Sequence, residues 1–206
     1  MSLKEYFSIE LRLLVDCRYA FTLFVSVIPK YTHFLGLHLL AVMSYETLKW
    51  TVDDVSYFCL TALAGGLLNT VLVVVLSKRL ADCKMLVVQN CVTLIPMAFI
   101  MMIPTMSNAS IQAILIYVSA FLLGVVDASC HILSISMISK IVSADHQAIG
   151  EAIRLIIFFI AYAVSGFGTS AIFYELFVGG GIILFINIVG LVMLIFYMNC
   201  NIENRE

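Results

Sequence analysis

The chain has 206 residues, of which 63% are hydrophobic and only 12% are charged, and its mean hydropathy is +1.09. A soluble domain carries roughly 45–50% apolar and about 25% charged residues, so the composition excludes that class and indicates a membrane protein. The formal net charge of −2 argues against nucleic acid as a partner. The cysteines and histidines form no cluster of zinc type, so no metal site and no cofactor is predicted.

Six apolar runs are long enough to cross a bilayer, which takes about 20 residues each. The sequence therefore predicts an all-α integral membrane protein with six transmembrane helices. The predicted spans are 19–43, 55–76, 85–103, 111–138, 149–173 and 176–198. We expect residues 1–18 to form a cytoplasmic amphipathic lead-in, residues 19–198 the six-helix membrane domain, and residues 199–206 a cytoplasmic tail.

The connectors between these runs are short and polar. Charged residues from Glu46 onward end the first run. Residues 77–84 form a basic connector after the second run, and Pro104 begins a turn after the third. Residues 143–147 follow the fourth run, and Tyr174-Glu175 predicts a tight hairpin before the last. Each connector is too polar or too rich in turn formers to stay in hydrocarbon.

The distribution of Lys and Arg predicts the orientation of the chain in the membrane. Of the eleven basic residues, Lys30 and Arg154 fall inside or at the edge of spans, and Lys49 stands alone on one side. The other side collects Lys4, Arg12, Arg18, Lys78, Arg79, Lys84, Lys140 and Arg205. Both termini are therefore predicted to be cytoplasmic. Asn108-Ala109-Ser110, a candidate N-glycosylation triplet at Asn108, then falls on the opposite side.

The fourth run contains Asp127 and His131, which are four residues apart and so lie on one side of a helix, about 6 Å apart along its axis. Lys30 and His33 lie three apart near the middle of the first run. Each charge at the bilayer centre costs about 2.5–3.5 kcal/mol on insertion scales, so these side chains should face protein or water.

Arg154 completes this candidate polar site, and Glu151, three residues earlier, is a partner for it on the same helix. Two interpretations stay open. One is internal neutralisation, in which Asp127 pairs with His131, or with Lys30 or Arg154 across helices. The other is a proton or cation relay, or a ligand site, that uses these five side chains: Asp127, His131, Arg154, Lys30 and His33.

Small residues recur where helices should approach closely, since small side chains let backbones pack in lipid. Gly124 and Ala128 are four apart, residues 64–66 read Ala-Gly-Gly, and residues 179–181 are three glycines. No catalytic motif occurs: there is no Gly-x-Ser-x-Gly, no His-Glu-x-x-His and no phosphate-binding Gly-Lys-Ser/Thr. The chain is therefore not expected to be an enzyme.

Two segments resemble a known superfamily. Six spans with cytoplasmic termini and a basic connector at residues 77–84 resemble one half of a major facilitator transporter. Gly124-Val125-Val126-Asp127-Ala128 resembles the Gly-x-x-Asp-Ala/Ser motif of the uncoordinated-93-like (unc-93-like) branch, and a short acidic loop at 143–145 and a helix with Arg154 near its start follow. The resemblance covers nearly the whole chain and matches the C-terminal six-helix half of that family.

The chain also departs from the family pattern. Residues 131–133 are His-Ile-Leu where the family usually has Asn-Thr-Gln, and Ile157-Phe158 stand where the family often has Gln-Ser. Polar residues that would line a transport cavity are therefore replaced by apolar ones at these places.

The resemblance implies a non-enzymatic regulator or partner of another membrane protein, such as an ion channel or a receptor in trafficking. The expected partners are membrane lipid and another membrane protein or a second six-helix half. One alternative is a proton- or cation-coupled secondary transporter of small solutes. Another is that the chain is a fragment or isoform of a twelve-helix protein.

Overall fold

The computed structural model is described here for residue 9 and residues 12–203, without the side chains of residues 170, 171, 174 and 197–203. All regular structure in this part of the chain is helical, and it contains six helices long and apolar enough to cross a membrane, as predicted. They are α2 (Cys17–Leu48), α3 (Val52–Leu76), α4 (Asp82–Met102), α5 (Ala109–Ile141), α6 (Gln147–Tyr174) and α7 (Leu176–Glu203).

The helices extend beyond the apolar runs, because backbone hydrogen bonding continues after hydropathy has fallen. α2 continues to Leu48 and ends at Lys49, which has a positive φ of 54° and whose N–H donates to the Ser44 carbonyl. α7 continues to Glu203, so residues 199–203 of the predicted tail are helical, and the cytoplasmic location of the tail stays a prediction. Most of the predicted lead-in (residues 1–8, 10 and 11) and Arg205 lie outside the described residues.

Side-chain caps begin three of the helices. The Asp16 carboxylate accepts the N–H groups of Arg18 and Tyr19 at the start of α2. Thr51 and Asp54 form a capping box at the start of α3. The Asn108 side chain accepts the N–H of Ser110 at the start of α5. Each cap satisfies backbone donors that the first turn of a helix leaves free.

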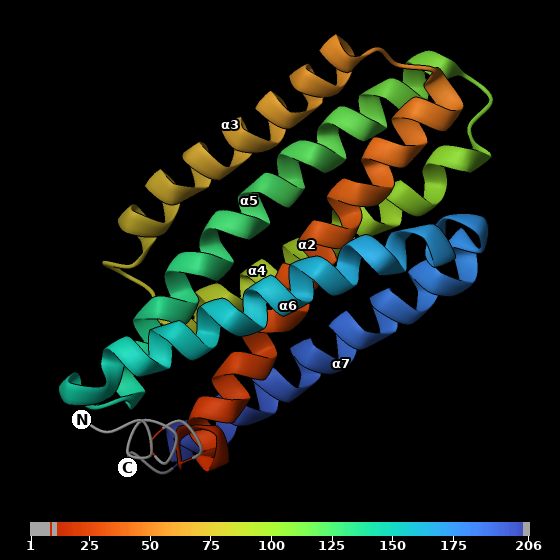
Figure 1. The fold of residues 1–206 in the computed structure, drawn as a ribbon. Coiled ribbons are helices and arrows are strands. Elements are labelled where there is room, and N and C mark those ends of the chain that lie inside the picture. The colour runs from red at the N-terminus through yellow and green to blue at the C-terminus, as the bar shows by residue number, and fades with distance from the viewer. Residues whose placement is uncertain (1–8, 10–11, 204–206) are drawn as a thin grey trace.

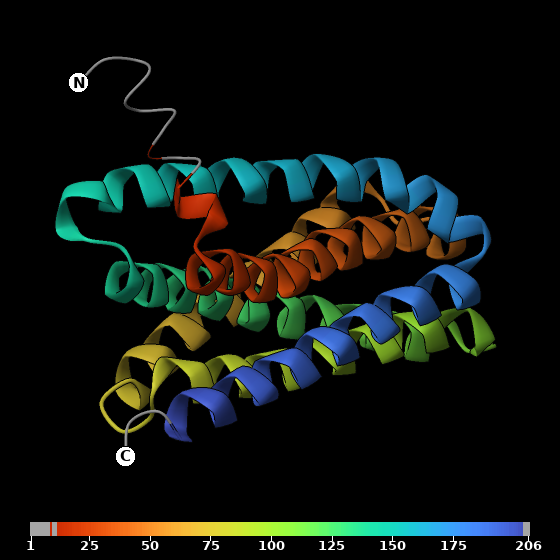
Figure 2. The same cartoon turned by 90° about the horizontal axis from the view of Figure 1, so that it is seen from below.

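α2 and α5 form the centre of the bundle and pack against each other. α3 packs on α5, and α6 packs on α2, so each central helix carries one flanking helix (Figure 1). α4 packs against α5 and α7. Figure 2 shows α6 along one side of the bundle and α4 and α7 along the opposite side, with α2 and α5 between them. The connection from α6 to α7 is the predicted hairpin, with Glu175 alone between the two helices.

The start of α2 and the end of α7 lie at the same end of the bundle (Figure 1). The connector between α3 and α4 lies at that end too, with Lys78 and Arg79, as does Lys140 in the last turn of α5. Lys49 lies at the other end, between α2 and α3. The structure therefore places Lys78, Arg79 and Lys140 at one end of the bundle and Lys49 at the other, as the sequence predicted. The cytoplasmic location of the basic end remains a prediction.

Candidate functional site

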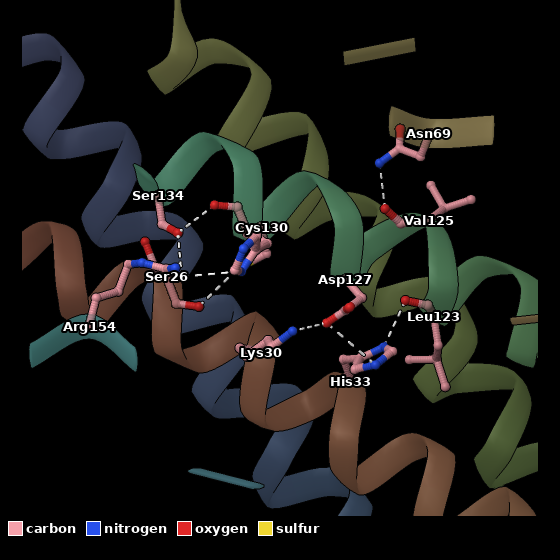
Figure 3. Close-up of polar contacts among 11 residues, drawn as sticks. Ser26, Lys30, His33, Asn69, Leu123, Val125, Asp127, Cys130, Ser134 and Arg154 are labelled. Atoms are coloured by element: carbon pink, nitrogen blue, oxygen red, sulfur yellow. Dashed lines mark hydrogen bonds and ion pairs between the residues drawn. The ribbon is translucent and has the colours of Figure 1, made fainter. Parts of the chain in front are cut away.

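Small residues, among them Gly65 and Gly124, form the contact between α3 and α5, which we call the seam. A Cβ atom on Gly65 would overlap the Phe121 carbonyl oxygen, and one on Gly124 would overlap the Ala62 carbonyl oxygen. The two backbones are thus in direct contact, as the small-residue pattern predicted for these positions. The amide of Asn69 donates from α3 to the Val125 carbonyl (Figure 3). It also donates to the Ser129 hydroxyl.

Asp127 follows this seam on α5 and forms an ion pair with Lys30 of α2 (Figure 3). Lys30 keeps only 10% of its side chain exposed, whereas Asp127 keeps 34%. The Lys30 ammonium also lies 4.8 Å from the ring centroid of Phe34 and 5.7 Å from that of Phe158. A carboxylate and two aromatic faces therefore compensate the charge of a lysine in the middle of a span.

His33 reaches the same carboxylate. Its Nδ1 lies 2.8 Å from the Leu123 carbonyl oxygen, which only accepts hydrogen bonds, so Nδ1 carries the proton in the neutral ring. Its Nε2 lies 3.5 Å from Oδ1 of Asp127 and then presents a lone pair to the carboxylate. A proton on either partner turns this contact into a hydrogen bond. The geometry of His33 and Asp127 is therefore compatible with one proton shared between them.

Arg154 forms a second polar group, one helix away. Its side chain is fully buried and pairs with Glu151 of its own helix, with a distance of 2.8 Å from Nε to Oε2. It also reaches α5, where one guanidinium nitrogen lies 3.2 Å from the Ser134 hydroxyl and 3.4 Å from Nδ1 of His131. Arg154 therefore connects α6 to α5.

Asp127 and His131 lie on one side of α5 as expected, yet they bind different neighbours. Asp127 contacts Lys30 and His33 of α2, and His131 contacts Arg154 of α6. Among the described contacts, no ion pair joins Asp127 to His131, so the pairing along one helix is wrong and the alternative pairing with Lys30 is the one observed. The five predicted side chains form two adjacent groups.

A cavity of about 310 Å³ lies beside these groups. The cavity has an aromatic wall that sequence reasoning missed, because Phe and Tyr in an apolar run carry no separate signal. The spacing of four between Phe158 and Tyr162 is the one sequence pattern that could have indicated that these two rings share a side of α6. The lining includes Lys30, His131, Phe34, Phe158, Phe159 and Tyr162.

The chemistry available to these groups is binding and proton exchange. Cys130 is buried and its thiol lies 3.0 Å from the Ser26 carbonyl oxygen, which makes it a packing residue. Among the described residues no group of three His, Cys, Asp or Glu side chains is placed to hold a metal ion. With neutral histidines the charges of Lys30 and Asp127 cancel, as do those of Arg154 and Glu151.

Asn108 lies apart from this site, exposed at the end of the bundle opposite the basic connector. Its side-chain oxygen caps α5, at a distance of 2.9 Å from the Ser110 nitrogen. The triplet is accessible there, and its glycosylation remains a prediction.

Comparison with known proteins adds no relative: no family model matches the chain, and neither the curated proteins nor the solved structures contain a match.

Proposed function

We propose that this chain is a membrane-embedded regulator or partner that acts by associating with another multi-helix membrane protein. The observation that carries the proposal is the exposure of Asp127, about a third of whose side chain is uncovered within a helix long enough to span the bilayer. A charged side chain at the bilayer centre costs about 2.5–3.5 kcal/mol on insertion scales, and the ion pair with Lys30 leaves part of this carboxylate uncovered. Helices of another protein, or of a second six-helix half, would cover it.

The arrangement of the helices supports a second half as the form of this partner. α3 packs on α5 as α6 packs on α2, which is the pairing expected when two three-helix units are related by an inverted repeat. The resemblance of residues 124–128 to the unc-93-like motif agrees with this arrangement. Membership of the major facilitator superfamily stays a proposal on these grounds.

Site-specific photo-crosslinking tests the association. Tyr162 of α6 is 49% exposed beside the cavity. Phe185 is 67% exposed and belongs to α7, a helix on the opposite side of the bundle from α6 (Figure 2). We expect a benzoylphenylalanine at Tyr162 to give a discrete protein adduct in native membranes, and the matched probe at Phe185 to give lipid adducts alone. A monodisperse monomer that forms no protein adduct from Tyr162 contradicts the proposal.

The second candidate function is proton- or cation-coupled transport of a small solute, and the contact between His33 and Asp127 favours it. Lys30, His33 and Asp127 meet in the middle of the spans, and the Asp127 carboxylate contacts both basic side chains. In proteoliposomes with a pH-sensitive dye, Asp127→Asn should abolish solute-dependent proton flux when the flux is compared at equal amounts of folded, reconstituted protein. Proton flux that persists in Asp127→Asn contradicts this candidate.

A further inference from the structure

The aromatic cavity opens at the side of the bundle. Phe159 and Tyr162 of α6 line it, yet 70% and 49% of their surfaces are exposed, so they form its rim. Phe158 is buried, and its ring centroid lies 5.7 Å from the Lys30 ammonium and 4.7 Å from the central carbon of the Arg154 guanidinium. Phe34 closes another side through an edge contact of 4.9 Å with the ring of Tyr162.

Two of the residues that line this cavity carry nitrogen donors with unused hydrogen-bonding capacity. Lys30 lines the cavity and has three N–H groups, of which the described residues accept one, at Asp127. His131 also lines it. Because a guanidinium only donates, Nδ1 of His131 must accept from Arg154, and its proton is then on Nε2. No described residue accepts a hydrogen bond from that Nε2.

We propose that the cavity binds a small aromatic monocarboxylate. The ring of such a ligand would pack against the phenylalanine and tyrosine side chains, and its carboxylate would accept from Lys30 and from Nε2 of His131. Charge-assisted hydrogen bonds of this kind are about twice as strong as neutral ones. An amine would place donors against donors. A purely apolar molecule would leave the remaining N–H groups of Lys30 and the Nε2–H of His131 without acceptors.

The size of the cavity agrees with this ligand class, since about 310 Å³ is at the lower end of the range of small-molecule pockets. Binding of the carboxylate is independent of the association proposed above. The proposed ligand would be the substrate class of the second candidate function. Transport of this ligand rests on that candidate, whereas its binding does not.

Titration calorimetry of the full chain in lipid nanodiscs tests the inference with 2-naphthoate as the probe and 2-naphthylmethylamine as the comparison. We expect saturable binding of 2-naphthoate and none of the amine. Phe159→Ala should weaken binding about tenfold, the upper range for loss of one aromatic contact. Phe185→Ala removes an equally exposed ring from α7 and should leave the affinity unchanged.

The donor is tested at His131 without touching the ion pair. His131→Leu removes the donor and should weaken 2-naphthoate binding about tenfold, whereas His131→Gln keeps an N–H group and should restore most of the affinity. The inference is overturned if 2-naphthoate does not bind, if the amine binds equally well, or if Phe159→Ala and Phe185→Ala weaken binding to the same degree. Absence of binding leaves the crosslinking from Tyr162 unaffected, so the two failures are distinguishable.

Discussion

Asp127 and Lys30 are each other's main source of neutralisation, and their coupling is measurable. Asp127→Leu leaves a buried ammonium without its carboxylate, which costs about 3–5 kcal/mol for a buried pair. The double variant Lys30→Met/Asp127→Leu removes both charges and should recover most of that loss. Unfolding in mixed detergent micelles gives the free energies. A double variant no more stable than Asp127→Leu alone contradicts the pairing.

Asn69 makes the polar contact between α3 and α5, and Thr70 beside it supplies a matched control. Asn69→Leu removes two donations to α5, and we expect a loss of about 0.6–2 kcal/mol in the free energy of unfolding. Thr70→Val removes a hydroxyl that donates only within its own helix and is exposed, so it should change stability little. If both substitutions lower the free energy of unfolding equally, the hydrogen bonds from Asn69 to α5 do not stabilise the contact between these helices.

The sequence located the charged members of the site, and it did not determine their partners. Lys30, His33, Asp127 and Arg154 stand out because a charge or an imidazole in an apolar run needs a compensating group. Spacing along one helix suggested Asp127 with His131, but side chains on one side of α5 reach different helices. Partner choice depends on how α2 and α6 pack beside α5, which periodicity within one helix does not contain.

At the scale of the helices, the seam of α3 and α5 predicts a large effect from one added methyl group. Gly124→Ala places a Cβ against the Ala62 carbonyl, so the two helices must separate, with a cost of about 1–3 kcal/mol for overpacking. Gly181→Ala on α7 meets nothing within 4 Å and serves as the control. Thermal unfolding of both variants in one detergent compares them. If Gly124→Ala is as stable as Gly181→Ala, the result contradicts the close contact between the backbones of α3 and α5.

The helices themselves could be predicted with few errors, because a span of about 20 apolar residues has hardly any alternative structure in lipid. Their ends were less predictable. α2 ends where Lys49 adopts a positive φ, and α7 continues to Glu203 through residues too polar to count as membrane-spanning. The small residues were interpreted correctly at Gly124 and Gly65, while Gly181 faces open space and has no packing role among the described residues.

At the scale of the whole molecule, the separation of basic residues predicts which end of the bundle is cytoplasmic. In a cysteine-free background, Ser77→Cys lies at the basic end and Ser107→Cys at the opposite end, and both positions are exposed. Sealed microsomes have their cytoplasmic side outward. We expect an impermeant maleimide to label Ser77→Cys directly and Ser107→Cys only after detergent is added. The reverse pattern would invert the orientation.

The packing of α3 mainly on α5 has a consequence for biosynthesis. α3 leaves the ribosome before α5, and α4 is made between them, so α3 must enter the bilayer before its main neighbour exists. Only 22% of the apolar part of α3 is buried inside the bundle, as expected for a helix that is stable in lipid before its neighbours are inserted. The seam of Gly65 and Gly124 then closes between two helices already inserted. Substitutions there should therefore leave insertion by the translocon intact and impair the later assembly of the bundle.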